Sequence, residues 1–145
     1  MRALIQRVSS AAVSVDGAVV GQIGAGLVVL LGVGAGDSDA QAAKLADKVS
    51  KLRMFDGAAG RMDRSLLEVG GAALCISQFT LYGDTRRGLR PSFTAAADPE
   101  TGERLYGVFC RELEARGVPV GTGRFGARMS VALVNEGPVT LLLEA

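Results

Sequence analysis

The chain contains no histidine and no tryptophan, and only two of its 145 residues are cysteine. Without histidine it cannot build a Ser-His-Asp triad or a Cys-His nucleophile pair, and the usual catalytic zinc sites lose their commonest ligand. Cys75 and Cys110 are too far apart for a CxxC motif and too few for a disulfide framework. We therefore expect two reduced, buried thiols, no metal site and no cofactor.

Charge of either sign is also sparse. Sixteen basic residues oppose fifteen acidic ones, which leaves a net charge of +1. This excludes nucleic-acid binding driven by bulk charge, although a local basic patch remains possible. Glycines and Gln22 interrupt the longest uncharged run, residues 17–36, which predicts hairpin strands rather than a membrane-spanning helix. The first residues do not resemble a signal peptide. We expect a cytoplasmic protein that does not contact membranes.

Hydrophobic residues and glycine are plentiful. Hydrophobic residues make up 48% of the chain, enough to bury a core in a domain of this length. Twenty glycines against four prolines, spread along the chain, indicate many short elements joined by tight turns. We expect one domain that covers residues 1–145.

Alternating apolar residues predict strands at both ends and in the middle of the chain. The expected strands are two or three within residues 3–23, with a turn at Asp16-Gly17, and others at 27–33, 72–78, 118–122, 128–135 and 139–144. Two of these are almost entirely apolar, 27–33 and 72–78, the second ending in Ser77 and Gln78, which indicates strands buried on both faces.

Two stretches have helical spacing. The first helix begins at Asp37 or Ser38 and has an apolar stripe at Leu45, Val49 and Leu52. The second begins at Asp98-Pro99, ends at Gly117, and carries an apolar face formed by Leu105, Val108, Phe109 and Leu113. The order of elements predicts an α/β fold: a layered β/β/α domain with strand-rich mixed sheets and two long helices on one face.

The stretch SQFTLYGDTRRG (residues 77–88) begins at the end of the second buried strand. If the strand continues, its side chains alternate, with Gln78 and Thr80 on one side and Ser77, Phe79 and Leu81 on the other. The hydroxyl groups suit a turn that they cap. The segment also suits a site whose backbone N–H groups hold a carbonyl oxygen while water attacks. A covalent role for Thr80 is disfavoured because no adjacent base is evident.

Other motifs leave alternatives open. Arg86, Arg87 and Arg90 form either a solvated loop or an RNA-binding site, and NEGPVT (residues 135–140) fits a turn between two strands. GTGRFG (121–126) matches the dinucleotide pattern GxGxxG, but a strand rather than a helix is expected after it. GVGAGD (32–37) lacks the lysine of a P-loop, so it indicates a plain turn from strand to helix.

Together, four stretches closely resemble the D-aminoacyl-tRNA deacylase family, in the same order over essentially the whole chain. They are QRVSSAAVSVDG, SQFTLYGDTRRGLRPSF, GRFGARMSVALVNEGP and NEGPVTLLLE. The resemblance implies hydrolysis of the ester that joins a D-amino acid, or glycine, to the 3′ end of tRNA. It also implies a homodimer whose active sites lie at the subunit interface and which serves chiral proofreading in translation.

The resemblance assigns residues to two parts of the site. Four residues would be catalytic and would surround the terminal adenosine and the aminoacyl carbonyl: Ser77, Gln78, Phe79 and Thr80. Gly137-Pro138 would be a cis dipeptide that one subunit inserts into the other's site, where its carbonyl oxygens exclude L side chains. Arg7 would brace this dipeptide and Met129 would pack beside it.

A rigid backbone edge is a physically sensible sensor of chirality. A hydrophobic pocket separates ligands that differ by one methylene by only about 1–3 kcal/mol, because its side chains can yield. Glycine has no side chain and would pass such a filter. Two other functions remain open from sequence: a tRNA-binding module without enzymatic activity, and a hydrolase of small esters or amides.

Overall fold

Six strands form one mixed sheet in the computed structural model, which describes all residues from Met1 to Ala145. Its order is β2 (Ala18–Ile23), β1 (Arg2–Val15), β3 (Gly26–Gly32), β6 (Ala72–Ser77) and β7 (Val120–Thr122), with β8 (Ser130–Glu144) paired to β1. The strands β3, β6 and β7 run parallel, and the other pairs are antiparallel. The expected mixture of strand directions is confirmed.

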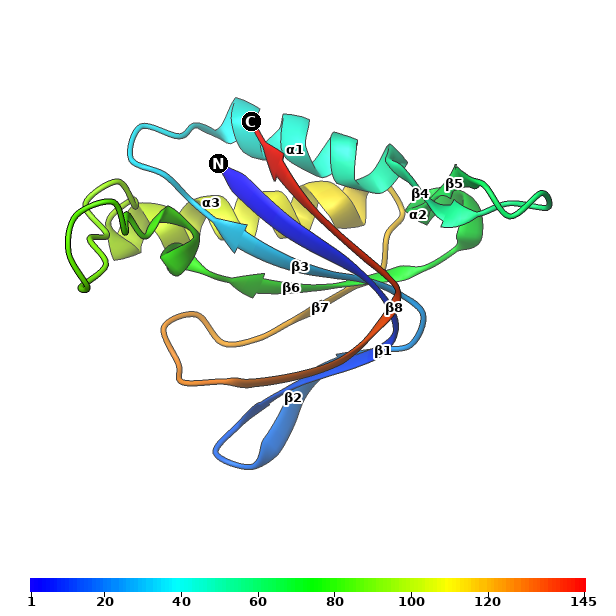
Figure 1. The fold of residues 1–145 in the computed structure, drawn as a ribbon, viewed down its shortest axis with the longest axis horizontal. Coiled ribbons are helices and arrows are strands. Elements are labelled where there is room, and N and C mark those ends of the chain that lie inside the picture. Colours follow the sequence, from blue (N-terminus) through cyan, green and yellow to red (C-terminus); the bar gives the residue numbers. More distant parts are fainter.

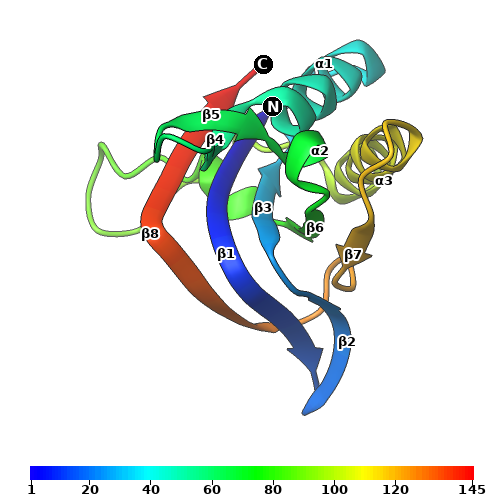
Figure 2. The ribbon, with the colours of Figure 1, turned by 90° about the vertical axis from the view of Figure 1, so that its right-hand side faces the viewer.

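The long strands bend and turn the single sheet into two layers. β1 pairs with β3 through its first half and with β2 through its second half, while β8 follows its other edge. Figure 2 shows β1 and β8 curving together away from the two long helices. The second half of β1, together with β2 and the first half of β8, thereby folds back over the rest of the sheet. The helices form a third layer on the opposite side (Figure 1).

Alternation along β3 and β6 produces a separate core on each face of the sheet. Leu27, Val29 and Leu31 of β3 point into the larger core beneath the helices. Val28 of β3, with Leu74 and Ile76 of β6, points into a smaller core inside the bend. These strands are buried on both faces, which explains why their sequences are almost entirely apolar.

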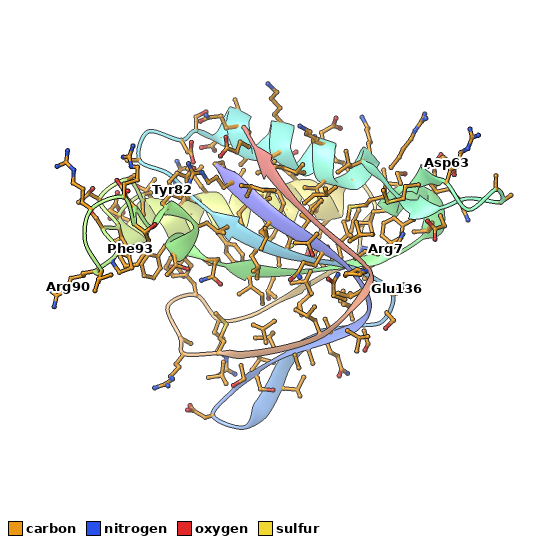
Figure 3. The ribbon with its side chains drawn as sticks, in the orientation of Figure 1. Arg7, Asp63, Tyr82, Arg90, Phe93 and Glu136 are labelled. Atoms are coloured by element: carbon orange, nitrogen blue, oxygen red, sulfur yellow. The ribbon has the colours of Figure 1, made fainter.

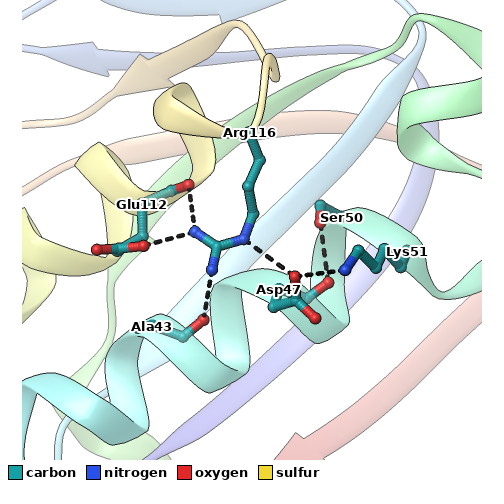
Figure 4. A network of polar contacts seen from close by, with 6 residues as sticks. All are labelled: Ala43, Asp47, Ser50, Lys51, Glu112 and Arg116. Atoms are coloured by element: carbon teal, nitrogen blue, oxygen red, sulfur yellow. Dashed lines mark hydrogen bonds and ion pairs between the residues drawn. The ribbon is translucent and has the colours of Figure 1, made fainter.

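The two long helices pack against each other above the sheet. Ser38 caps the N-terminus of α1 (Asp39–Lys51), and Asp98 caps that of α3 (Pro99–Ala115), where its carboxylate accepts a hydrogen bond from the Thr101 N–H at 2.9 Å. Arg116 joins the helices: it donates to the Asp47 carboxylate of α1 at 3.2 Å and to the Glu112 carbonyl of α3 at 2.8 Å (Figure 4). Neither helix has the length and apolar character needed to cross a bilayer.

Some sequence predictions need correction. Leu52 lies one residue beyond α1 and is half-buried. The two strands expected at 128–135 and 139–144 form one strand, β8, because β1 pairs with both parts. Two further features were not predicted from the sequence: the hairpin of β4 (Arg53–Asp56) and β5 (Met62–Ser65), and the short helix α2 (Leu66–Val69). As expected, no helix follows GTGRFG.

Candidate functional site

A pocket of about 580 Å³ lies where β3 and β6 end. These strands are parallel, so their carboxyl ends meet at one edge of the sheet, and side chains from several segments can converge there. Ten of the sixteen lining residues are hydrophobic. The predicted site residues among them are Ser77, Gln78, Phe79 and Met129. The structure thus brings together three residues of the SQFT motif and Met129, far away in sequence.

The segment after Ser77 is helical rather than extended. η1 (Phe79–Tyr82) is a 3₁₀ helix, in which the Leu81 N–H donates to the Gln78 carbonyl at 3.2 Å. The expected strand alternation from Gln78 to Leu81 is therefore wrong. The physical reason is that β3, the neighbour of β6, ends at Gly32. The Gln78 N–H still donates to the Leu31 carbonyl at 2.8 Å, but the residues after Gln78 have no neighbouring strand with which to pair.

This turn changes the placement of Thr80. Its side chain is outside the pocket lining, where its hydroxyl accepts a hydrogen bond from the Gln78 side-chain amide. The first N–H groups of a helical turn have no acceptor within that turn. The backbone N–H groups of Phe79 and Thr80 are therefore the donors that η1 can offer to a ligand oxygen. The arrangement favours positioning by the backbone over attack by the Thr80 hydroxyl.

Arg2 fixes the other end of η1. It donates from Nη1 to the Leu81 carbonyl at 2.8 Å, and its guanidinium lies 4.6 Å from the centre of the Tyr82 ring. Glu144 pairs with Arg2 at 3.0 Å. On the other side, a Cβ at Gly34 would come within 2.8 Å of Tyr82, so the ring and the strand end pack closely. Both ends of the chain thus hold the turn in place.

Asp98 is the only ionisable residue that lines the pocket. Hydrogen bonds from the backbone and the hydroxyl of Thr101 lower its pKa below the usual value. A carboxylate that is engaged in this way and stays ionised is a weak base near neutral pH. The pocket therefore offers backbone and amide dipoles rather than a group suited to general acid-base catalysis.

Gly137-Pro138 lies outside this pocket. The peptide between the two residues is cis, as the resemblance implies. β8 bulges at this point, because Val8 faces Asn135 while Gln6 faces Thr140. Figure 3 shows Arg7 and Glu136, at this corner, well away from Tyr82 and Phe93. Within one chain, the dipeptide and the SQFT segment do not meet.

Arg7 braces the corner through hydrogen bonds to two main-chain carbonyls. Its side chain donates to the Glu136 carbonyl at 3.3 Å and to the Met54 carbonyl at 3.0 Å. Asn135 adds a second brace, because its side-chain amide donates to the carbonyls of Arg7 at 2.9 Å and Val139 at 3.0 Å. Arg7 therefore contacts the residue that directly precedes the Gly137-Pro138 dipeptide.

Replacing Arg7 by methionine is expected to lower the free energy of unfolding by about 1–3 kcal/mol, because the buried Met54 carbonyl loses its donor. Urea denaturation measures this change. Arg64→Met is the control: Arg64 also donates to a carbonyl, that of Glu68 at 3.0 Å, but at an exposed position. Its effect should stay within about 0.5 kcal/mol. Equal losses in the two variants would contradict the bracing role.

Two of the three candidate RNA-binding arginines, Arg86 and Arg87, line a second hollow of about 450 Å³. The other residues that line this hollow are Asp84, Ser92 and Thr94.

Both cysteines, Cys75 and Cys110, are free and buried, as expected.

Phe93 and Phe125 also line the main pocket, although neither was predicted as a site residue from the sequence. Phe93 packs edge-on against Phe79 with ring centroids 5.1 Å apart. Neither ring has a sequence spacing that would have identified it.

The model of the family described as D-Tyr-tRNA(Tyr) deacylase matches residues 4–144. A D-aminoacyl-tRNA deacylase of Roseiflexus castenholzii is 59% identical over 145 residues, which cover 100% of this chain and 92% of the relative. One of Ruegeria pomeroyi is 60% identical over 144 residues and covers 99% of each chain.

Solved structures agree on the fold. The structure of a c-Myc DNA unwinding element binding protein superposes with a TM-score of 0.95 at 36% identity, covering 100% of this chain and 99% of the other. A probable eukaryotic D-amino acid tRNA deacylase, 18% identical, shares the fold with a TM-score of 0.83 and covers 98% and 97% of the two chains. The sequence match over residues 4–144 decides the assignment: this chain belongs to the D-Tyr-tRNA(Tyr) deacylase family.

Proposed function

We propose that this protein hydrolyses the ester bond between a D-amino acid and the 3′ end of tRNA. The observation that carries the proposal is the pocket formed by Ser77, Gln78 and Phe79 in a chain that matches this family over almost its whole length. Curated relatives about 60% identical are D-aminoacyl-tRNA deacylases. In the proposed reaction, water adds to the ester carbonyl, and the products are a free D-amino acid and tRNA.

The chemistry of the pocket fits ester hydrolysis without an ionisable catalyst. The Phe79 and Thr80 N–H groups would hold the carbonyl oxygen as it gains negative charge, which is the kind of stabilisation an oxyanion hole provides. Phe79 and Phe93 present apolar ring faces on which the terminal adenine can stack. The ribose 2′-hydroxyl next to the ester is the remaining polar group close to the reacting carbon.

Chiral selection in this proposal comes from a second copy of the chain. Gly137-Pro138 of one subunit would enter the pocket of the other, and its main-chain carbonyl edge would exclude L side chains. The separation of this corner from the pocket within one chain supports an arrangement in which the partner completes the site. A glycyl ester would pass this filter, so glycyl-tRNA is proposed as a second substrate.

The outer edge of β8 supports a homodimer. β8 is fifteen residues long and pairs only with β1, so its other edge is free. Large apolar side chains are exposed on this strand: Val131, Val134, Leu141 and Leu142. A long, apolar, unpaired edge strand is a template for association with another chain. We propose that this edge meets a second copy.

A deacylation assay on D-Tyr-tRNA, L-Tyr-tRNA and Gly-tRNA, with a chelator present, tests the proposal. We expect rapid release from the D and glycyl substrates and little from the L substrate. Equal rates on the D and L substrates would contradict chiral selection. Tight tRNA binding without any hydrolysis would instead identify an RNA-binding module, and turnover of free D-amino-acid esters without RNA would identify a small-ester hydrolase.

Thr80→Ala is expected to keep measurable turnover. Removing one oxyanion donor typically costs about 10²–10³ in kcat, but alanine retains the backbone N–H, so the loss should be smaller than that. Single-turnover kinetics measures the loss, and Thr122→Ala, at an exposed threonine of β7, is the control with wild-type rate. A trapped ester on Thr80 in rapid-quench mass spectrometry of the wild type would contradict the positioning role.

A further inference from the structure

A short basic tip closes the loop between η1 and α3. We define the tip as residues 86–90, with the sequence RRGLR. Its base is fixed by two backbone hydrogen bonds. The Asp84 N–H donates to the Ser92 carbonyl at 2.7 Å, and the Ser92 N–H donates to the Asp84 carbonyl at 2.9 Å. The tip therefore projects from a defined pair of residues, and Figure 3 shows Arg90 at the outer end of the molecule.

The loop that carries the tip is also fastened to the pocket. Phe93, just after the base of the tip, packs against Phe79 at 5.1 Å, and both rings line the pocket. Further along, the Ala97 N–H donates to the Val33 carbonyl at 3.0 Å. The position of the tip relative to the pocket is thus set by contacts on the pocket wall itself.

The three arginines of the tip differ in their surroundings. Arg86 forms a two-point ion pair with Asp84, with distances of 2.9 and 2.7 Å. These bonds lower the pKa of Asp84 to about 2, so the carboxylate stays ionised and offsets the charge of Arg86. Arg87 and Arg90 take part in none of the salt bridges of the chain. The tip therefore presents two uncompensated positive charges.

The surroundings of these charges combine polar donors with an apolar contact. The hollow of about 450 Å³ beside the tip has no hydrophobic lining residue: Arg87 and the hydroxyls of Ser92 and Thr94 line it, together with the Asp84 carboxylate that Arg86 neutralises. Leu89, between the free arginines, is fully exposed. Phosphate groups suit the donors, whereas Leu89 suits the face of a base. Duplex RNA keeps its base faces stacked inside the helix, but an unpaired strand can offer them.

We propose that Arg87 and Arg90 bind the two phosphodiesters that precede the terminal adenosine of tRNA, while Leu89 contacts an unstacked base of the same unpaired strand. The proposal rests on the proposed function, because it takes the terminal adenosine to lie in the main pocket. It gives Arg86 no role in RNA binding. The tip holds the strand that leads into the pocket, and the pocket holds the ester.

Three D-tyrosyl esters of increasing length test this: the ester of adenosine, the ester of the trinucleotide CCA, and D-Tyr-tRNA. With wild-type protein, we expect kcat/KM to be at least tenfold higher for the CCA ester than for the adenosine ester. In the double variant Arg87→Gln, Arg90→Gln, this preference should fall below about threefold. Each phosphate neutralised on a single strand contributes about 0.7 to the salt slope, so the slope for the CCA ester should flatten by about 1.4.

The control is the double variant Lys44→Gln, Arg61→Gln, which removes the same charge at exposed positions on α1 and the β4–β5 connection. It should keep the preference for the CCA ester. The proposal is overturned if the tip variant keeps the wild-type preference for the CCA ester. It is also overturned if kcat/KM of the wild type is higher than for the adenosine ester only with whole tRNA and not with the CCA ester. Failure of the wild type to hydrolyse any of the three esters would instead reject the proposed function.

Discussion

Replacing Val134 by lysine is expected to leave the chain folded but monomeric, and to lower kcat/KM for D-Tyr-tRNA at least 100-fold. Val134 lies on the edge strand β8 and is 57% exposed in the single chain, so the lysine ammonium group can remain in water there. In the proposed dimer, the same side chain would bring an unpaired charge into an apolar interface, which costs several kcal/mol. Light scattering and the deacylation assay on the same sample measure both effects.

Val19→Lys is the matched control for Val134→Lys. Val19 lies on β2 and is 56% exposed, almost the same as Val134, but no other large exposed hydrophobic residue accompanies it on that strand. We expect this variant to remain dimeric and active. A monomeric wild type with full activity, or a monomeric Val134→Lys with wild-type activity, would show that one chain suffices for catalysis.

Gly137→Ala is expected to lower the ratio of kcat/KM for D over L substrates by about 100-fold. Gly137 has φ of +117°, and a Cβ there would lie 2.9 Å from both Arg7 Nη2 and Val139 Cγ2. The corner must therefore move to accept alanine. A displacement of about 1 Å in a positioning group can change rates by about 10². The loss should come mainly from faster hydrolysis of L-Tyr-tRNA, because the filter itself is displaced.

Backbone strain alone must be separated from this displacement. Gly60 also has positive φ, +71°, but a Cβ there would meet nothing within 4 Å. Positive φ should cost each alanine variant about 1–2 kcal/mol of stability, and Gly137→Ala should lose more because its Cβ also meets Arg7 and Val139. Only Gly137→Ala should change the D/L ratio. An unchanged ratio in a folded Gly137→Ala dimer would show that the corner is a turn without a role in selection.

Local patterns predicted the elements that depend on local chemistry. Asp98-Pro99 and Gly117 marked the limits of α3 because capping acts within one turn. The continuous apolar sequences of β3 and β6 predicted burial on both faces. The end of β6 was misread because its limit is set by a neighbour: β3 stops at Gly32, and no pattern within SQFTL reports that.

The site was predictable where a motif carries it and not where packing does. Ser77, Gln78 and Phe79 came from one contiguous motif, and the structure places all three in the pocket wall. Phe93 and Phe125 reach the same wall from separate loops, and their distance in sequence depends on how those loops fold. The separation of Gly137 from the pocket likewise follows from the path of β8, which no local pattern encodes.

The parallel pairing of β3 and β6 also affects the order of folding. A helix, a hairpin and a short second helix lie between these strands along the chain, so their pairing closes a long loop. Loop closure of this kind carries an entropic cost that antiparallel neighbours such as β1 and β2 avoid. The pocket floor at the end of β6 should therefore form later in folding than the β1–β2 hairpin.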